Sequence, residues 1–213
     1  MMKSINITKG YDSNFKNIVP CFTPGTLIAT PKGEREIESL SIGDRILTRD
    51  NGIQEVTWMG HRSLSATELG DAPSLRPILI RAGSFGSGSP ERDMLVSPMH
   101  RMLVTSKLAK KYFGEREVLV AARDLTNVPG IDQVKVAGTT YLHFMCDKHQ
   151  IVLANGTWTE SFQPNDYAIK GVVKEQRDEL FKICPSLALP EGRRGYKLAR
   201  KALRRVESLA LFK

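Results

Sequence analysis

Short runs of apolar and β-branched residues recur between positions 21 and 166, and turn residues separate them. This pattern is typical of an all-β domain built from many short strands. The hairpin signals Asn51-Gly52 and Asn155-Gly156 support it, because both residue types tolerate positive φ. The predicted strands are residues 27–28, 45–48, 56–59, 77–80, 102–104, 117–120, 140–144 and 150–153.

The periodicity changes after Gly171. Apolar residues then recur at spacings of three and four, which predicts two amphipathic helices, the second beginning near Arg194. We therefore expect a helical C-terminal extension over residues 171–213 and a short polar leader over residues 1–20. The extension is predicted to pack on the β domain through Val173, Leu180, Phe181, Leu203 and Val206.

Positive charge is concentrated in this extension. The whole chain carries +8, and residues 191–213 hold eight basic and two acidic residues, which leaves +2 for the rest. Such a run could contact nucleic acid or an anionic membrane. A solvated helix face is the commoner outcome, and no aromatic stacking platform accompanies the charge. We therefore expect no nucleic-acid partner.

The cysteine content and the lack of long apolar runs indicate where in or outside the cell the protein acts. Three cysteines leave at least one unpaired in the monomer, which favours a reducing environment over a disulfide scaffold. The sequence contains no apolar run of 18 residues, so we expect no transmembrane segment. The start lacks the apolar middle of a signal peptide. The expected location is cytoplasmic, or outside the cell after export without a cleavable signal peptide.

The candidate chemistry lies at Cys21, which begins the β-rich region, and at Ser97 and His100, which follow far downstream in Ser97-Pro98-Met99-His100. A thiol needs a base to become a good nucleophile, since its pKa is about 8.5. A histidine can transfer protons, and a hydroxyl can hydrogen-bond near developing charge. We predict that Cys21 and His100 converge in one cleft. For each residue taken alone, a packed core position is the commoner outcome, because buried cysteines are usually inert.

Three blocks of residues in a fixed order make the combination specific. They run from Cys21 to Asp50, from Met94 to Val104 around Ser97 and His100, and from Tyr141 through His149 to Asn155-Gly156. Together they resemble the Hint superfamily, which comprises inteins and hedgehog autoprocessing domains. A bacterial subfamily with a Ser-Pro-x-His-Arg block and a Glu-Ser-Phe ending is the most similar; here that ending is residues 160–162.

The resemblance implies a compact all-β horseshoe and a reaction of the chain upon itself. Cys21 would attack the Pro20–Cys21 bond in an N–S acyl shift and form a thioester. Ser97 and His100 would activate the scissile amide, and His143 or His149 would assist resolution. The substrate would be the chain's own N-terminal segment. The acyl acceptor stays open between water, a thiol and another nucleophile.

Full splicing is not expected, because residues 157–162 lack the His-Asn pair that ends splicing inteins. Proline before the cysteine also hinders approach to its carbonyl. Two alternatives therefore remain: a degenerate Hint scaffold that serves as an interaction module, and a cysteine hydrolase that acts on another molecule.

A metal or cofactor is not expected. His143, Cys146 and His149 have the spacing His-x-x-Cys-x-x-His, which on a helix would gather three zinc ligands on one face. The segment is predicted to be a strand, where residues three apart point to opposite faces. The third cysteine, Cys184, precedes a proline near a helix end and is interpreted as packing.

Overall fold

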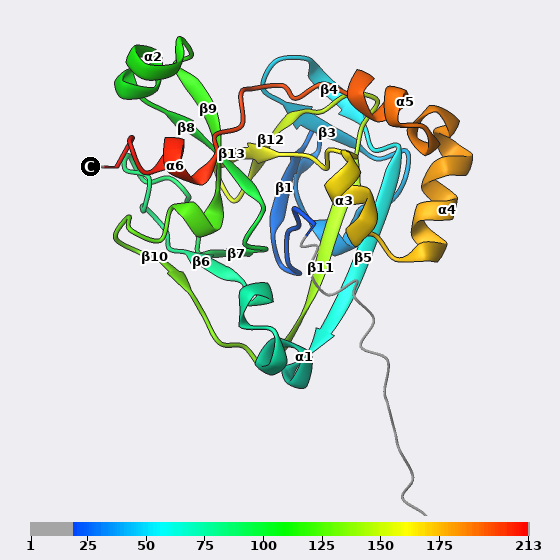
Figure 1. The fold of residues 1–213 in the computed structure, drawn as a ribbon, viewed down its shortest axis with the longest axis horizontal. Helices are drawn as coiled ribbons and strands as arrows, with labels where there is room; N and C mark the ends of the chain where they lie inside the picture. The colour runs from blue at the N-terminus through cyan, green and yellow to red at the C-terminus, as the bar shows by residue number, and fades with distance from the viewer. Residues whose placement is uncertain (1–18, 213) are drawn as a thin grey trace, which may run out of the picture.

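The computed structural model describes residues 19–212 and shows a mostly antiparallel β domain with short helices at its C-terminal end (Figure 1). All eight predicted strands overlap observed ones, so the all-β prediction with a helical C-terminal extension is confirmed. The predicted leader, residues 1–20, lies outside the described residues except for its last two. The strands are β1 (Leu27–Thr30), β2 (Gly33–Glu36), β3 (Arg45–Thr48), β4 (Gly52–Glu55), β5 (Trp58–Ser65), β6 (Ile78–Ile80), β7 (Met94–Val96), β8 (Arg101–Thr105), β9 (Glu117–Ala121), β10 (Ile131–Gln133), β11 (Gly138–Met145), β12 (Ile151–Ala154) and β13 (Thr157–Glu160).

The helices are short, and four of the six α-helices in residues 19–212 follow the last strand. Among residues 19–212, no helix is long and apolar enough to cross a lipid bilayer. The α-helices are α1 (Ala66–Asp71), α2 (Lys107–Phe113), α3 (Asp166–Gly171), α4 (Lys174–Ile183), α5 (Pro190–Gly195) and α6 (Arg205–Ser208). The 3-10 helices are η2 (Ile37–Ser39), η3 (Pro73–Leu75), η4 (Ala122–Asp124) and η5 (Pro185–Ala188).

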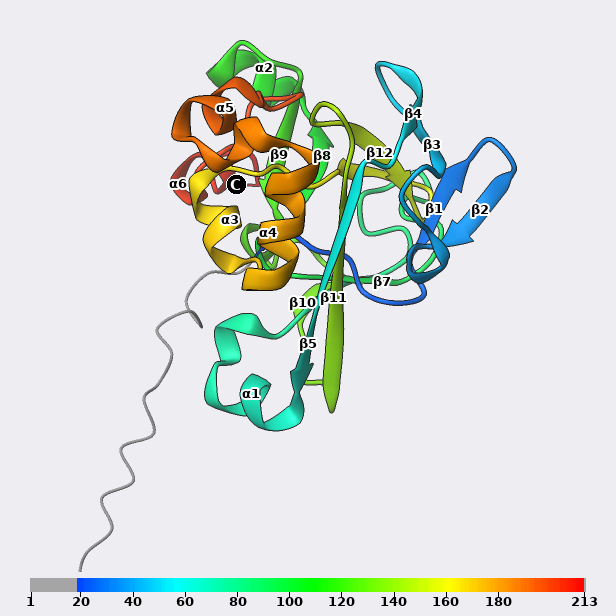
Figure 2. The ribbon, with the colours of Figure 1, turned by 90° about the vertical axis from the view of Figure 1, so that its right-hand side faces the viewer.

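Three sheets make up the β domain. The largest has the order β2-β1-β12-β13-β8-β9, with β3 paired to β12 and β4 paired to β3. A second sheet has the order β10-β6-β7, and the long strands β5 and β11 form the third. In Figure 2 the β5–β11 pair runs down the middle, with β1 to β4 on one side and α3 to α6 on the other.

The turn at Asn155-Gly156 shows how the sequence sets one of these strand pairs. Both residues adopt positive φ, 47° and 72°, as a tight hairpin between β12 and β13 requires. The Asn155 side chain also accepts a hydrogen bond from the Leu27 N–H at 2.8 Å, which ties the turn to the start of β1. The predicted hairpin is therefore confirmed.

The apolar residues form two clusters. One fills the space between the sheets and includes Phe22, Ile46 and Phe144. The other lies between the β5–β11 pair and the C-terminal helices, where Trp58 and Leu180 are fully buried. Burying a side chain of that size contributes about 1.5–3 kcal/mol, so the helices are an integral part of the core.

The predicted second helix from Arg194 to residue 210 is wrong. Residues 196–204 form no helix; they bend at 196 and 199–200, and Ala202 pairs with Leu119 in a parallel bridge at the edge of β9. Leu119 donates to the Lys201 carbonyl and accepts from the Leu203 N–H, both at 2.9 Å. The open edge of β9 thus provides hydrogen-bond partners for backbone groups of this segment. This pairing outweighs the helical preference that the periodicity indicated.

This change of conformation redistributes the apolar side chains. Leu203 is buried as predicted, whereas Val206 is 72% exposed and Val173 is 38% exposed, so neither packs as expected. The basic side chains meet acidic partners on the β domain: Arg200 forms ion pairs with Asp50 and Glu117 at 2.7 and 2.9 Å.

Candidate active site

The backbone of Cys21 is held between two strands. Phe22 exchanges two hydrogen bonds with Leu142 of β11, at 2.8 and 2.9 Å, and bridges to Val96 of β7. The Ser97 N–H donates to the Cys21 carbonyl at 2.9 Å. Because strand pairing leaves little freedom to the chain, these bonds fix both the cysteine and the peptide bond before it.

Ser97 contacts the nitrogen of the Pro20–Cys21 bond and the carbonyl of the peptide bond before it. Its Oγ accepts the Cys21 N–H at 2.8 Å and donates to the Val19 carbonyl, also at 2.8 Å. A hydroxyl carries a single hydrogen, so these roles are the only consistent ones. The side chain is fully buried. Ser97 therefore holds the nitrogen that would leave when this bond is cleaved.

The thiol of Cys21 meets His143 of β11, whose Nδ1 lies 3.3 Å from Sγ. The imidazole is packed between aromatic rings, with centroids 4.8 Å from Phe162 and 5.1 Å from Trp58. On β5, Gly60 lies directly opposite His143. A Cβ at Gly60 would come within 2.5 Å of His143 Nε2, so only glycine leaves room for this ring.

Burial keeps this pair uncharged. It raises the pKa of the Cys21 thiol far above its usual value, and Arg62 and Ser97 offset this only in part. Burial also lowers the pKa of His143 to about 3, with a smaller contribution from His61. The resting pair is therefore a neutral thiol beside a neutral imidazole, whose Nε2 is buried without a hydrogen-bond partner among residues 19–212.

His100 is not the hydrogen-bond partner of the thiol and does not line the cavity at Cys21, and its convergence with Cys21 stays a prediction. Its ring packs on Phe22, with centroids 4.3 Å apart, and its Nε2 lies 2.6 Å from Thr159 Oγ1. Thr159 donates its hydroxyl hydrogen to the Arg101 carbonyl, so it accepts from His100 Nε2–H. Nδ1 is then an unprotonated buried nitrogen without a hydrogen-bond partner in the described structure.

The pKa of His100 is also depressed. Burial lowers it to about 4, against an opposing effect of the Glu160 carboxylate. At neutral pH His100 is thus a base and not an acid. The sequence could not have assigned this state, because it depends on how deeply the folded chain buries the ring.

His149 lies in a separate buried network. The Ala199 N–H donates to its Nδ1 at 3.1 Å, so Nε2 carries the hydrogen that points to Glu160 at 3.1 Å. Burial alone would raise the pKa of Glu160, but Arg101 and His149 hold it below its usual value. Arg101 binds the same carboxylate at 2.9 Å. His149 is thereby fixed between strand and C-terminal segment, and not at the thiol.

Sequence reasoning missed Thr159 and Glu160. Both residues belong to the Thr-Glu-Ser-Phe sequence at 159–162, which directly follows the block from Tyr141 to Gly156, and this position could have identified them. The zinc spacing does not become a site: His143 contacts Cys21 while His149 contacts Glu160, and among residues 19–212 no group of three metal-ligating side chains comes together.

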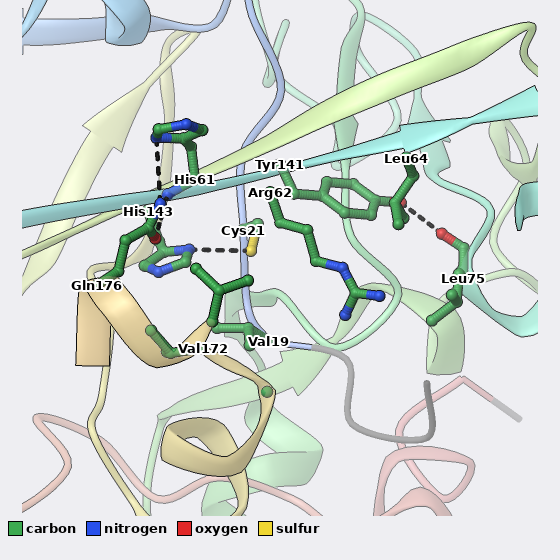
Figure 3. Close-up of a pocket in the computed structure, with 12 residues that line it drawn as sticks. Val19, Cys21, His61, Arg62, Leu64, Leu75, Tyr141, His143, Val172 and Gln176 are labelled. Atoms are coloured by element: carbon green, nitrogen blue, oxygen red, sulfur yellow. Dashed lines mark hydrogen bonds between the residues drawn. The ribbon is translucent and has the colours of Figure 1, made fainter. Parts of the chain in front are cut away.

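A small cavity adjoins the thiol (Figure 3). Its volume of about 20 Å³ is room for one water molecule. Cys21 itself is only 3% exposed. The cavity wall combines Val19, the β5–β11 pair and the segment between α3 and α4; its residues are Val19, Cys21, His61, Arg62, Leu64, Leu75, Tyr141, His143, Gly171, Val172, Val173 and Gln176.

Comparison with known proteins places this geometry in context. The Hint domain family model matches residues 20–166. No curated protein matches the chain. Among solved structures, a bacterial intein-like domain from Clostridium thermocellum is 11% identical, with a TM-score of 0.42 over 68% of this chain and 99% of that one. A DnaB intein from Synechocystis sp. PCC 6803 is 10% identical, with a TM-score of 0.39 over 67% and 98%.

Proposed function

The chain belongs to the Hint domain family, and on that premise we propose that it cleaves its own Pro20–Cys21 bond through a thioester, without splicing. The observation that carries this proposal is the pair of contacts at Cys21. Its amide nitrogen is bound by Ser97 and its thiol by His143, so both ends of an N–S acyl shift are held at one residue.

The chemical step follows from these contacts. Sγ bonds to the Pro20 carbonyl carbon, the bond to the Cys21 nitrogen breaks, and one proton moves from the thiol to the freed amine. With the imidazole hydrogen on Nε2, His143 Nδ1 accepts the thiol proton, because it lies 3.3 Å from Sγ. Ser97 can turn its hydroxyl hydrogen from Val19 to the nitrogen as that atom becomes basic. The family resemblance assigns His100 to amide activation; because its Nδ1 is unprotonated at rest, it must take up a proton before it can donate one to the leaving nitrogen.

The roles of the histidines are refined by this arrangement. His143 is the residue beside the thiol and takes the assisting role that the sequence left open between His143 and His149. Thr159 is a positioning residue, because it fixes the tautomer of His100. In a Thr159→Val variant, ¹⁵N NMR of the imidazole would then show a mixture of tautomers, and cleavage would have an altered pH profile.

The test is the intact mass of purified protein with and without hydroxylamine. We expect release of the segment that ends at Pro20, no release from Cys21→Ala, and normal release from the control Cys184→Ala. His100→Ala should slow release about a hundredfold, the usual contribution of a positioned acid–base group. Pro20→Gly should speed it, because the carbonyl becomes easier to approach. A folded Pro20→Gly protein that stays intact would rule the proposal out.

A second candidate is a Hint scaffold that serves as an interaction module without chemistry. It is favoured by the burial of Cys21, because a thiol with a raised pKa beside a histidine with a lowered pKa strongly resists proton transfer. A protein that keeps its full mass after hydroxylamine treatment in the same measurement would support this non-catalytic scaffold. A hydrolase acting on another molecule is less well supported, because the cavity at the thiol has room for one water and not for a peptide.

A further inference from the structure

The wall of the cavity at Cys21 is completed by residues that the family match does not include. The match ends at residue 166, whereas Gly171, Val172 and Gln176 contribute to the wall. They lie at the end of α3 and in the first turn of α4. We call residues 171–176 the roof of the site. In Figure 3 Gln176 and Val172 lie beside His143 and Val19, next to the thiol.

Contacts at both ends hold the roof in place. The Gln176 side chain accepts the His61 backbone N–H at 2.9 Å, and its amide lies 3.4 Å from His61 Nδ1. Further along α4, Leu180 is fully buried in the cluster that contains Trp58. At the start of α3, the Asn165 side chain accepts two backbone N–H groups, at 3.0 and 2.9 Å. The roof is therefore latched to β5 by Gln176 and anchored by a buried helix face.

The narrow cavity limits what can reach the thiol. A volume of about 20 Å³ accommodates one water molecule, and a thiol or amine of metabolite size is larger than this space. The Val19 side chain, which is 6% exposed, lines the same cavity.

We propose that the roof selects the acyl acceptor by size and admits water, so that the thioester ends in hydrolysis. This inference rests on the proposed cleavage. In the step it implies, the water oxygen bonds to the Pro20 carbonyl carbon, the bond to Sγ breaks, and one water proton returns to the sulfur. The products are a free Cys21 thiol and a peptide that ends in the Pro20 carboxylate.

The first test measures access to Cys21 and needs no cleavage. Folded protein is treated with methyl methanethiosulfonate or with a polyethylene-glycol maleimide, and each cysteine is followed by peptide mass mapping. Cys184 is half exposed and serves as the internal reference. We expect the bulky reagent to label Cys184 and spare Cys21. Gln176→Ala should raise labelling of Cys21 on the order of tenfold, the effect of one or two lost hydrogen bonds on local opening.

Glu175→Ala is the matched control, because Glu175 is an exposed neighbour on the same helix. Equal labelling of Cys21 and Cys184 in the unaltered protein would overturn the proposal. Equal labelling of Cys21 in the Gln176→Ala and Glu175→Ala variants would also overturn the proposal.

The second test identifies the acceptor. Cleavage in H₂¹⁸O should place one ¹⁸O in the released peptide, at a rate that added glutathione does not change. In Gln176→Ala, glutathione should compete and yield its thioester. A glutathione adduct from the unaltered protein would refute the size selection while leaving the cleavage intact. No release under any condition would refute the cleavage and the acceptor together, even if the labelling results hold.

Discussion

Acidification should destabilise this protein through His143, a buried histidine that is held neutral. Its pKa is lowered to about 3 in the folded state by burial. In the unfolded chain its pKa is about 6.5. As the pH falls, the unfolded state therefore binds a proton before the folded state does. The contribution of neutral His143 to the unfolding free energy is fully present above pH 6.5 and is lost as the pH falls from 6.5 to the folded pKa.

The magnitude follows from the size of the shift. At pH 5 the unfolded histidine is almost fully protonated and the folded one is not, which costs about 2 kcal/mol of unfolding free energy relative to pH 8. His100, with a folded pKa of about 4, adds a similar loss of about 2 kcal/mol. The unaltered protein should thus lose about 4 kcal/mol between the two pH values from these two residues.

The assay is urea unfolding at pH 8 and pH 5, followed by tryptophan fluorescence. His143→Gln cannot be protonated, so it should lose about 2 kcal/mol less than the unaltered protein over this interval. The control is Ile46→Val, in a distant part of the core, which should lower stability by about 1 kcal/mol at both pH values. If His143→Gln and the unaltered protein lost the same free energy on acidification, burial would not be what keeps His143 neutral.

Two further predictions concern the packing that supports the site. Gly60→Ala places a Cβ within 2.5 Å of His143 Nε2, so urea unfolding should show that the variant is less stable by about 1–3 kcal/mol. The control is Gly70→Ala, whose Cβ meets no atom within 4 Å and which should lower stability far less. Equal losses of stability in the two variants would show that the His143 ring can move aside. Removing residues 196–213 uncovers the edge of β9 and the buried Leu203, which should lower the melting temperature and reduce stability by about 3 kcal/mol. An unchanged melting temperature would mean that this segment contributes nothing to the core.

The strands could be predicted from the sequence because each needs only local information. Short apolar runs between turn residues define them, and the Asn155-Gly156 turn identified a hairpin by backbone preference alone. The helix near Arg194 failed for the opposite reason. Its conformation is decided by the edge of β9, which is some 80 positions away in the chain and leaves no mark in the local pattern.

The site was only partly predictable. Ser97 was placed at the scissile amide by its position in a family block, and the structure gives it that contact. The histidine beside the thiol was not resolved, because it depends on the register of β11 against Phe22 and β5. That register brings His143 to Cys21 and leaves His100 to Thr159. A glycine opposite a histidine on a paired strand was the one available clue.

Because the roof lies C-terminal to the site residues, it is synthesised after them. A ribosome makes Cys21, Ser97 and His143 before it makes residues 171–176, and domains fold from the N-terminal side as they emerge. Until α4 is made, the part of the wall that Gly171, Val172 and Gln176 supply is missing, and the cavity at Cys21 is not closed on that side. Translation of α4 then closes it, so the finished chain carries a covered form of a centre that was open while the chain was being made.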